Sequence, residues 1–258
     1  MPRSIYEVWS RRSLIITLAV TDLKLRYRNS VLGFSWSFLE PLLMLTVLYL
    51  VFTNIFKGAI EHYPLFLLLG LITWNMFSRG TNMGMDSILS KAGLVSKTYL
   101  PREVVVVSGV LTSFLMMLLE LIVFFIFMIG FRVIPADTVI VMPFMLPLLF
   151  VLTLGASFAL SSLYVYFRDI KSIWGVVLQA GLFLSTIMYK IDIFPQSIRP
   201  IISLNPIIPF VDMLRNATIY GKWPDANNMA YVVGIVFTVL VVGYAVFKRL
   251  DRRIIEEL

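Results

Sequence analysis

The stretch TDLKLRYRNSVLGFSWSFLEPLL, residues 21–43, decides how the rest of this chain is interpreted. It places three cations within five positions, Lys24, Arg26 and Arg28, and then continues into an apolar run that extends to Phe56. Cations are retained on the cytoplasmic side of membrane helices, where the anionic leaflet attracts each of them by about 1 kcal/mol. The stretch therefore predicts a basic collar in the headgroup layer, followed by a membrane helix. A solvated charge run is the alternative, but it does not explain the adjoining run of about 20 apolar residues.

Composition places the chain among membrane proteins. Of its 258 residues, 59% are hydrophobic and only 14% are charged, whereas soluble domains carry about 25% charged residues. We therefore expect an all-α polytopic membrane protein. The net charge of +7 does not indicate a nucleic-acid partner, because the cations gather at the ends of apolar segments instead of forming one polar face. Cysteine is absent and His62 is the single histidine, so neither disulfides nor a typical zinc site is expected, and no metal or cofactor is predicted in this chain.

Six segments reach or approach the length that spans about 30 Å of hydrocarbon at 1.5 Å per residue. We place them at 34–56, 63–83, 104–131, 139–167, 173–189 and 229–247, of which the fifth is short. Before them, Ile5, Val8 and Trp9 fall at helical spacing opposite polar residues, which is typical of an amphipathic helix in the interface. The whole chain, 1–258, then forms one transmembrane domain. Its parts are the interfacial helix and collar (1–33), five spans (34–189), an external hairpin (191–224), the sixth span (229–247) and a tail (248–258).

The distribution of cations predicts the orientation. Fifteen Lys and Arg residues fall in the segments on the side of the termini, and six fall on the opposite side. By the positive-inside rule, both termini are expected to be cytoplasmic. No small-residue cleavage site follows the first apolar positions, so we expect the N-terminal segment to be retained.

The segment 191–224 is unusual for an external loop. It contains two apolar runs, each too short to span a membrane, separated by Asn205 and Pro206. Short apolar pieces broken by proline are typical of a re-entrant hairpin shielded by protein. We therefore predict an external re-entrant gate at Asn205, Pro206 and Pro209. Two interfacial helices lying flat are the alternative.

No motif for nucleotide or hydrolytic chemistry is present. The single Gly-Lys pair, Gly221-Lys222, is followed by Trp223, so the G-x-x-x-x-G-K-[ST] phosphate loop is missing. Any ATP must be bound by a partner. We expect a transport subunit without its own ATPase motif, and no enzyme activity.

Ionisable residues inside the predicted spans are few. Glu120 is surrounded by Leu and Ile, and a proton relay would need several such groups along one path, so a structural hydrogen bond is the preferred interpretation. Arg79 and Asp86 lie near the inner end of the second span. Glu40 lies near the inner mouth of the first span, where it is expected to pair with the collar.

Aromatic residues are abundant within the spans, and flat aromatic faces suit the apolar C–H faces of sugar rings. Seven of them are predicted to line a common channel: Trp36, Tyr49, Phe52, Trp74, Phe77, Phe183 and Tyr189. Packing against lipid is an equally good interpretation for any single one.

An ordered set of motifs resembles a known family. DLKLRYRNSVLGFSWSFLEPLL, WNMF, SKTYLPREV, YFRDI and LNP together resemble the membrane subunit of ABC-2 type polysaccharide exporters, which move O-antigen, teichoic acid and capsule polymers. The resemblance covers nearly the whole chain. It implies the ABC-2 exporter fold in the cytoplasmic (inner) membrane and a homodimer that forms a continuous channel. It also implies two copies of an ABC ATP-binding subunit, which carry ATP and Mg, and a glycan on a polyprenyl-pyrophosphate carrier as substrate.

The resemblance also suggests roles for individual residues. Two loops become elements that couple to the ATPase, with the residues Lys91, Lys97, Thr98, Tyr99, Phe167, Arg168, Asp169 and Lys171. The donors suited to phosphate oxygens at the lipid-pyrophosphate entrance are Lys24, Arg26, Arg28 and Arg102.

Three other functions stay open at this point. An ABC-2 permease for a drug or free lipid would transport a small hydrophobe without polymer accumulating in mutant cells. An intramembrane glycosyl- or acyltransferase using Glu120 or His62 would turn over a lipid-linked sugar without ATP. A structural protein of an envelope complex would not co-purify with an ATPase.

Overall fold

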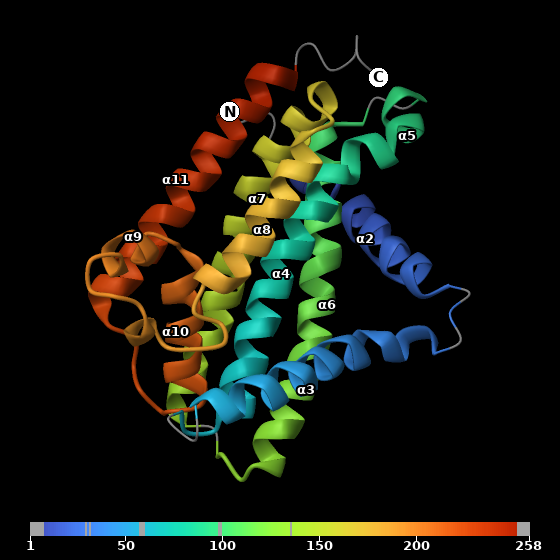
Figure 1. The fold of residues 1–258 in the computed structure, drawn as a ribbon. Coiled ribbons are helices and arrows are strands. Elements are labelled where there is room, and N and C mark those ends of the chain that lie inside the picture. Colours follow the sequence, from blue (N-terminus) through green and yellow to red (C-terminus); the bar gives the residue numbers. More distant parts are fainter. Residues whose placement is uncertain are drawn as a thin grey trace.

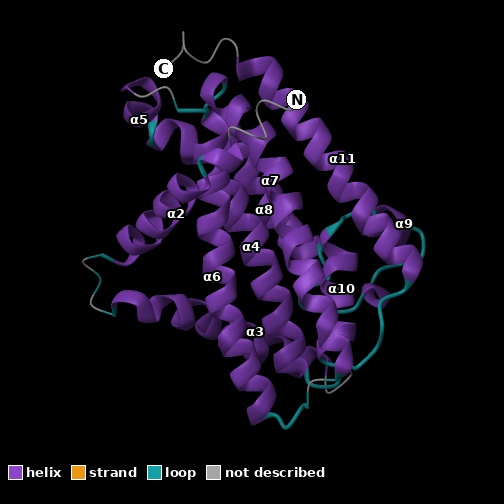
Figure 2. Ribbon diagram, turned by 180° about the vertical axis from the view of Figure 1, so that it is seen from behind, coloured by secondary structure: helices purple, strands orange, loops and turns teal. Residues whose placement is uncertain are grey.

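The computed structural model of the chain describes residues 8–28, 30, 32–56, 60–97, 100–134 and 136–251, with the side chains of 34, 53–56, 95–97 and 251 excepted. Helices make up most of this part, and no strand occurs in it (Figure 2). The predicted all-α fold class is confirmed.

The centre of the bundle is α4 (Tyr63–Ser90), which packs against α6 (Arg102–Gly130) and α7 (Met142–Tyr166) (Figure 1). Glycines make these contacts close. A Cβ at Gly80 would lie 2.5 Å from the Thr153 side chain of α7, and a Cβ at Gly109 of α6 would lie 2.8 Å from the Met83 carbonyl oxygen. Small residues at helix contacts are the usual means by which membrane helices approach each other. As a result, α4 is buried along most of its length.

Helix α11 (Ala226–Asp251) packs along the other side of α7. A Cβ at Gly243 of α11 would lie 1.9 Å from the Gly155 carbonyl oxygen, so the two backbones touch at this point.

The two N-terminal helices lie on the outside of the bundle, at an angle to its axis. Helix α2 (Arg12–Tyr27) packs against α6, and after the turn η1 (Gly33–Ser35), α3 (Trp36–Phe56) crosses α4 and α6 at a steep angle (Figures 1 and 2). The axes of α2 and α3 are inclined to each other (Figure 1).

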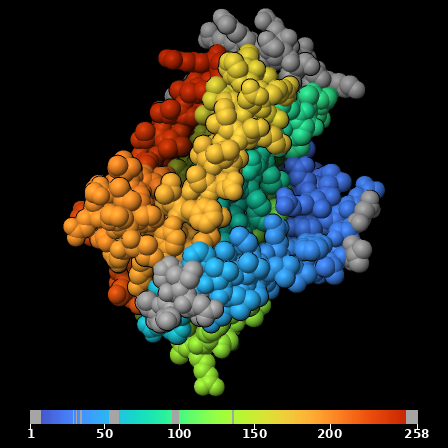
Figure 3. Space-filling view, in the orientation of Figure 1, coloured from blue at the N-terminus to red at the C-terminus, as the bar shows by residue number. Residues whose placement is uncertain are grey.

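Helix α8 (Ile170–Leu184) lies on the surface, with only Leu178 among its residues buried (Figure 3). Four short elements complete the chain: α5 (Ala92–Lys97), η2 (Asp137–Val141), η3 (Ile191–Ile193) and α9 (Arg199–Ser203). The longer α10 (Ile207–Thr218) is buried against α4, α7 and η2.

The chain has two distinct ends along the bundle axis. Helix α2 begins, and α11 ends, near the end that carries α5, whereas α10 packs toward the other end (Figure 1). We call these the α5 end and the α10 end.

The observed helices refine the predicted spans. Among the described residues, three segments are long and apolar enough to cross a membrane: α6, α11 and the segment Asp137–Tyr166 that contains α7. The apolar stretches described in α3 and α8 are Trp36–Phe52 and Ile170–Leu184. Helix α4 continues to Ser90, beyond the predicted residue 83, because its polar residues face protein and do not end it. The total of six spans stays a prediction.

Candidate functional site

The basic helix α2 is held on α6 by apolar and backbone contacts. Ile15 packs in a cluster with Leu100, Val104 and Val105, and the Thr112 hydroxyl donates a hydrogen bond to the Ala19 carbonyl at 3.3 Å. The helix therefore runs along α6, starting from the α6 N-terminus. Its last two turns, with the collar cations, lie farther from the α5 end.

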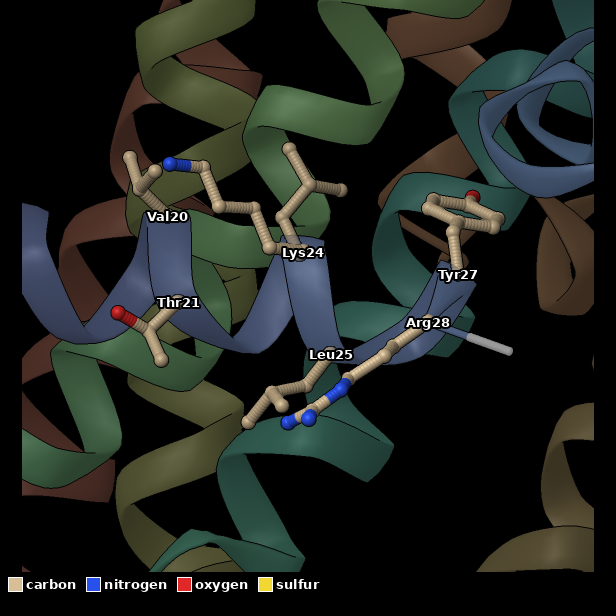
Figure 4. A pocket seen from close by; sticks show the side chains of 7 residues that line it. Val20, Thr21, Lys24, Leu25, Tyr27 and Arg28 are labelled. Carbon is tan, nitrogen blue, oxygen red and sulfur yellow. The ribbon is translucent and has the colours of Figure 1, made fainter. Parts of the chain in front are cut away.

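The collar residues Lys24, Arg26 and Arg28 are all exposed. Lys24 and Arg28 border an open hollow of about 640 Å³, which is lined by residues of α2 and by Arg28, the residue that caps its C-terminus. Their side chains diverge, Lys24 toward the top and Arg28 toward the bottom of the view (Figure 4). The collar therefore presents separate donors along a surface and does not form an enclosed cavity.

Arg102 does not join the collar. It is the first residue of α6, close to the Ile15 end of α2. Arg26 of the collar is close enough to Glu120 to interact with it electrostatically. Glu120 lies 18 residues after Arg102 in α6, which is roughly 27 Å at 1.5 Å per residue. The predicted entrance set is thus divided between three residues on α2 and one near α5.

Glu120 forms the predicted hydrogen bond inside the bundle. Its side chain is fully buried, and its Oε1 accepts a hydrogen bond from the Arg79 guanidinium at 2.5 Å. Arg79 also donates from Nε to the Asn75 carbonyl at 3.3 Å. Within the described residues, the second oxygen of Glu120 has no hydrogen-bond partner. A buried pair of this kind joins α4 to α6 and holds a charge that neither helix could bury alone.

Among the described residues, three ion pairs cross between helices at the α5 end. Lys91 Nζ donates to Asp22 Oδ2 of α2 at 2.5 Å, and Lys171 Nζ of α8 lies 3.0 and 2.8 Å from the two carboxylate oxygens of Asp86 on α4. The third pair joins Lys248 of α11 to Glu103 of α6. Sequence reasoning missed all three, because the partners are between 69 and 145 positions apart.

The predicted coupling residues fall into two groups. Lys91 and Lys171 are in the ion pairs above, whereas the side chains of the α7–α8 turn, Phe167, Arg168 and Asp169, are exposed. Arg168 lies over the Tyr164 ring, with Cζ 5.5 Å from its centroid. Thr98 and Tyr99 lie outside the described residues, as does the side chain of Lys97.

The predicted aromatic residues do not form one wall within a single chain. Trp74 is buried between α4 and α8, where a Cβ at Gly181 would lie 2.6 Å from its ring, and Phe77 packs against both Trp74 and Trp174. These rings join α4 to α8. The more exposed members are Trp36 and Tyr49 on α3 and Phe183 on α8. Phe52 packs partly buried against the core, and the Tyr189 hydroxyl donates to the Phe183 carbonyl.

The predicted gate residues shape the start of α10. Asn205 Oδ1 accepts a hydrogen bond from the Ile207 backbone N–H at 3.0 Å, and Asn205 Nδ2 donates to the Ser185 hydroxyl at 2.8 Å. Pro206 precedes the helix and Pro209 lies in its first turn, where a missing N–H is tolerated. Asn205 thus fixes α10 to the turn that follows α8.

Arg215 of α10 is a buried residue, although the sequence placed it among the external loop charges. Its guanidinium donates to the carbonyls of Phe66 at 3.1 Å, Thr186 at 3.0 Å and Ile187 at 2.7 Å. It also stacks on the Phe66 ring, with Cζ 3.3 Å from the centroid. Gly70 leaves room for it, since a Cβ there would lie 2.5 Å from the guanidinium. The only sequence signal was an arginine that directly follows the apolar run before it.

Known proteins match the chain over most of its length. Residues 13–219 match the family described as ABC-2 type transporter. An O-antigen export system permease protein RfbA of Klebsiella pneumoniae is 29% identical over 250 residues, which cover 94% of each chain. RfbA of Myxococcus xanthus is 28% identical over 96% of each chain, and the polysialic acid transport protein KpsM of Escherichia coli is 22% identical over 96% of each.

Proposed function

This chain belongs to the ABC-2 type transporter family, and from that premise we propose that it is the permease subunit of an ATP-driven exporter of a polyprenyl-pyrophosphate-linked polysaccharide. The observation that carries the proposal is the extent of the likeness to relatives named for O-antigen and polysialic acid export, 94–96% of this chain. A match of that extent favours a similar cargo over a drug or a free lipid.

The α5 end is assigned to the cytoplasm, with both termini, in the cytoplasmic (inner) membrane. The cation distribution supports this orientation, because the ion-paired lysines, the collar and the α7–α8 turn lie in the segments richest in Lys and Arg. The opposite end, with α10, then faces outward.

The partners are a second copy of the chain and two copies of an ABC ATP-binding subunit, which bind ATP and Mg. The sequence of this chain has no phosphate loop, so energy must come from such a subunit. Its docking site is α5 together with the turn at 167–169, whose side chains are exposed at the α5 end. The second copy covers the exposed apolar faces of α3 and α8, which include Leu43, Val47 and Val176.

The collar receives the pyrophosphate. Guanidinium and ammonium groups form strong charge-assisted hydrogen bonds with phosphate oxygens, and the exposed Lys24, Arg26 and Arg28, spaced at every second position, suit an extended headgroup. The lipid tail stays in the bilayer. The glycan then moves between the two protomers, where exposed aromatic residues such as Tyr49 and Phe183 offer shallow contacts to sugar rings.

The collar is tested with the double variant R26A/R28A. We expect export of polymer to the cell surface to fall at least about tenfold, since each lost charge-assisted contact contributes about 1.5–3 kcal/mol. Co-purification with the ATP-binding subunit should be unchanged. The matched control is K190A/K222A, which removes two exposed cations at the other end of the molecule and should export normally. Normal export by R26A/R28A would refute the role of the collar.

The orientation is tested by thiol labelling, for which the cysteine-free chain gives no background. A cysteine at Gly93 in α5 should be protected from a membrane-impermeant reagent in intact cells, and a cysteine at Lys222 should react. The reverse pattern would place α5 outside and contradict the proposal.

The cargo is tested with the purified complex of both subunits. A synthetic polyprenyl-pyrophosphate-linked oligosaccharide should raise the ATPase rate, whereas the polyprenyl-pyrophosphate without sugar should raise it less. Equal stimulation by a glycan-free lipid would favour the free-lipid permease instead.

A further inference from the structure

We propose that Asp22 and Asp86 are positioning residues that join the corner between α4 and α5 to α2 and α8, so that a movement of α5 moves the collar and α8 together. This inference rests on the proposed function, because it takes α5 as part of the docking site for the ATP-binding subunit. It assigns a role to two acidic residues that had no role in the sequence analysis, although Asp22 opens the motif DLKLRYRN.

Lys91 occupies the corner itself. Helix α4 ends at Ser90 and α5 begins at Ala92, so Lys91 is the single residue between them. Its backbone N–H donates to the Ser87 carbonyl at 3.2 Å, which fixes the residue to the last turn of α4. A change in the angle between α4 and α5 is therefore absorbed at Lys91.

The Lys91 side chain carries that change to α2. Its ammonium lies 2.5 Å from Asp22 Oδ2 and 3.5 Å from the Ser108 hydroxyl of α6. The side chains of Lys91 and Asp22 are only 16% and 24% exposed, so water screens the pair less than it screens a surface ion pair. Asp22 stands two residues before Lys24 in the same continuous helix. A displacement of Asp22 therefore displaces the collar as well.

The link from α4 to α8 is built similarly but is weaker. Lys171, the second residue of α8, lies within 3.0 Å of both carboxylate oxygens of Asp86, one turn before the end of α4. These side chains are 51% and 37% exposed, so this ion pair contributes less free energy than the pair of Asp22 and Lys91. The two helices are also joined by the hydrogen bond from Trp174 Nε1 to the Thr81 hydroxyl at 3.0 Å. Loss of Asp86 should therefore cost less than loss of Asp22.

An ion pair suits a moving joint better than interlocked apolar side chains. A lysine reaches its partner through a flexible four-carbon stem, so the pair tolerates a change of angle without opening a void. Interlocked apolar side chains would resist the same change, because protein interiors are close-packed.

The experiment uses the complex with the ATP-binding subunit, reconstituted in vesicles with the synthetic polyprenyl-pyrophosphate-linked oligosaccharide. The measured quantity is oligosaccharide transported per ATP hydrolysed. We expect this ratio to fall about fivefold in D22N and about twofold in D86N, while the basal ATPase rate stays unchanged. The charge exchange D22K/K91D should restore it to within about twofold of the wild type.

A matched control separates coupling from stability. E103Q removes an ion pair at the same end, but between α6 and α11, which do not meet at the corner. Its ratio should equal that of the wild type. A purely structural role for Asp22 would lower complex yield in D22N and E103Q alike and leave both ratios unchanged.

A cross-link gives a second, independent test. In D22C/K91C, with no other cysteine in the chain, the reduced form should show the low ratio of D22N, and cross-linking with a flexible bis-maleimide, whose spacer replaces the lysine stem, should restore it. The inference is overturned if D22N keeps the wild-type ratio, or if the cross-linked form transports no better than the reduced form. If the wild-type complex itself shows no glycan-dependent transport, the proposed function fails instead, so the two failures are distinguishable.

Discussion

The two ends of the bundle are held together by different kinds of bond. At the α5 end, helices are joined by ion pairs between two side chains, such as Asp22 with Lys91 and Asp86 with Lys171. At the α10 end, the buried side chains bind mainly main-chain carbonyls, although Arg215 also lies 3.6 Å from Asp212 Oδ1 and Asn205 binds the Ser185 hydroxyl. Arg215 binds three such carbonyls, the Tyr63 hydroxyl donates to the Met188 carbonyl at 2.9 Å, and Thr138 donates to the Ala217 carbonyl at 2.6 Å.

The difference indicates which end is built to move. A bond between two flexible side chains survives a rotation of either helix, whereas a bond to a buried carbonyl fixes the donor to the backbone of the other element. Breaking the second kind leaves a buried polar group without a partner, which costs about 1–3 kcal/mol. The α10 end is therefore a rigid frame and the α5 end is an adjustable joint. The predictions below test this contrast, from the largest expected effect to the smallest.

The largest effect is expected for R215M. The change removes the donor from three buried carbonyls, so we expect a loss of about 4 kcal/mol in unfolding free energy. Thermal unfolding of the purified protein in detergent measures it. The control K222A, at an exposed cation of the same end, should unfold like the wild type. Equal unfolding temperatures for R215M and K222A would remove the basis for a rigid frame.

The next effect is expected between the two ends, at Glu120. E120L leaves the Arg79 charge in the bundle without its carboxylate, at a cost of about 3 kcal/mol. Replacing both residues, in R79L/E120L, removes the unpaired charge and should recover most of that loss. The same unfolding measurement applies. A double variant less stable than E120L would show that the pair itself stabilises the middle of the bundle.

The same substitution, glycine to alanine, can be made at each end of the bundle and the two effects compared. In G70A the new methyl group meets the guanidinium of Arg215 at 2.5 Å, and overpacking of this kind costs about 1–3 kcal/mol. In G93A, within α5, nothing described lies within 4 Å, and alanine favours a helix. We expect G70A to be destabilised and G93A to be unchanged or slightly stabilised. Equal behaviour would mean that packing at the two ends is similar.

The smallest effect is expected for K171A. Both partners of its ion pair are exposed by more than a third, so unfolding free energy should change by less than about 1 kcal/mol. Raising the salt concentration should remove even this difference, because exposed charges are screened. A loss comparable to that of R215M would show that the α5 end is as rigid as the α10 end.

The sequence predicted the elements better than the contacts between them. Composition and the collar gave the all-α membrane class, and the predicted sixth span lies inside α11. The fifth span was predicted at 173–189, whereas the helix in this region, α8, covers Ile170–Leu184 and is followed by a turn. Thr186 has a φ of 53°, and the Thr186 and Ile187 carbonyls are bound by Arg215, 28 or more positions away. A linear pattern contains no sign of such a partner.

For the candidate site too, the sequence predicted residues that are close together in the chain but not the contacts between distant residues. Residue type and clustering sufficed to single out Lys24, Arg26 and Arg28, which are neighbours in the last turn of α2 and at its C-cap. Arg102 was grouped with them on chemistry alone, and the fold places it elsewhere. Lys91 and Lys171 were selected as cations in short loops, but the carboxylates that bind them come from distant parts of the chain, so their internal bonds were not predictable.

The central position of α4 also bears on how the protein is made. This helix carries Arg79 and Asp86, and it is not among the helices apolar enough to cross a membrane by composition. Its two main neighbours, α6 and α7, follow it in the chain and so leave the ribosome after it. A newly made α4 partitions poorly into lipid by itself, so we expect the translocon to retain it until α6 supplies Glu120. Biogenesis of this protein would then proceed by insertion of helices in groups, not one at a time.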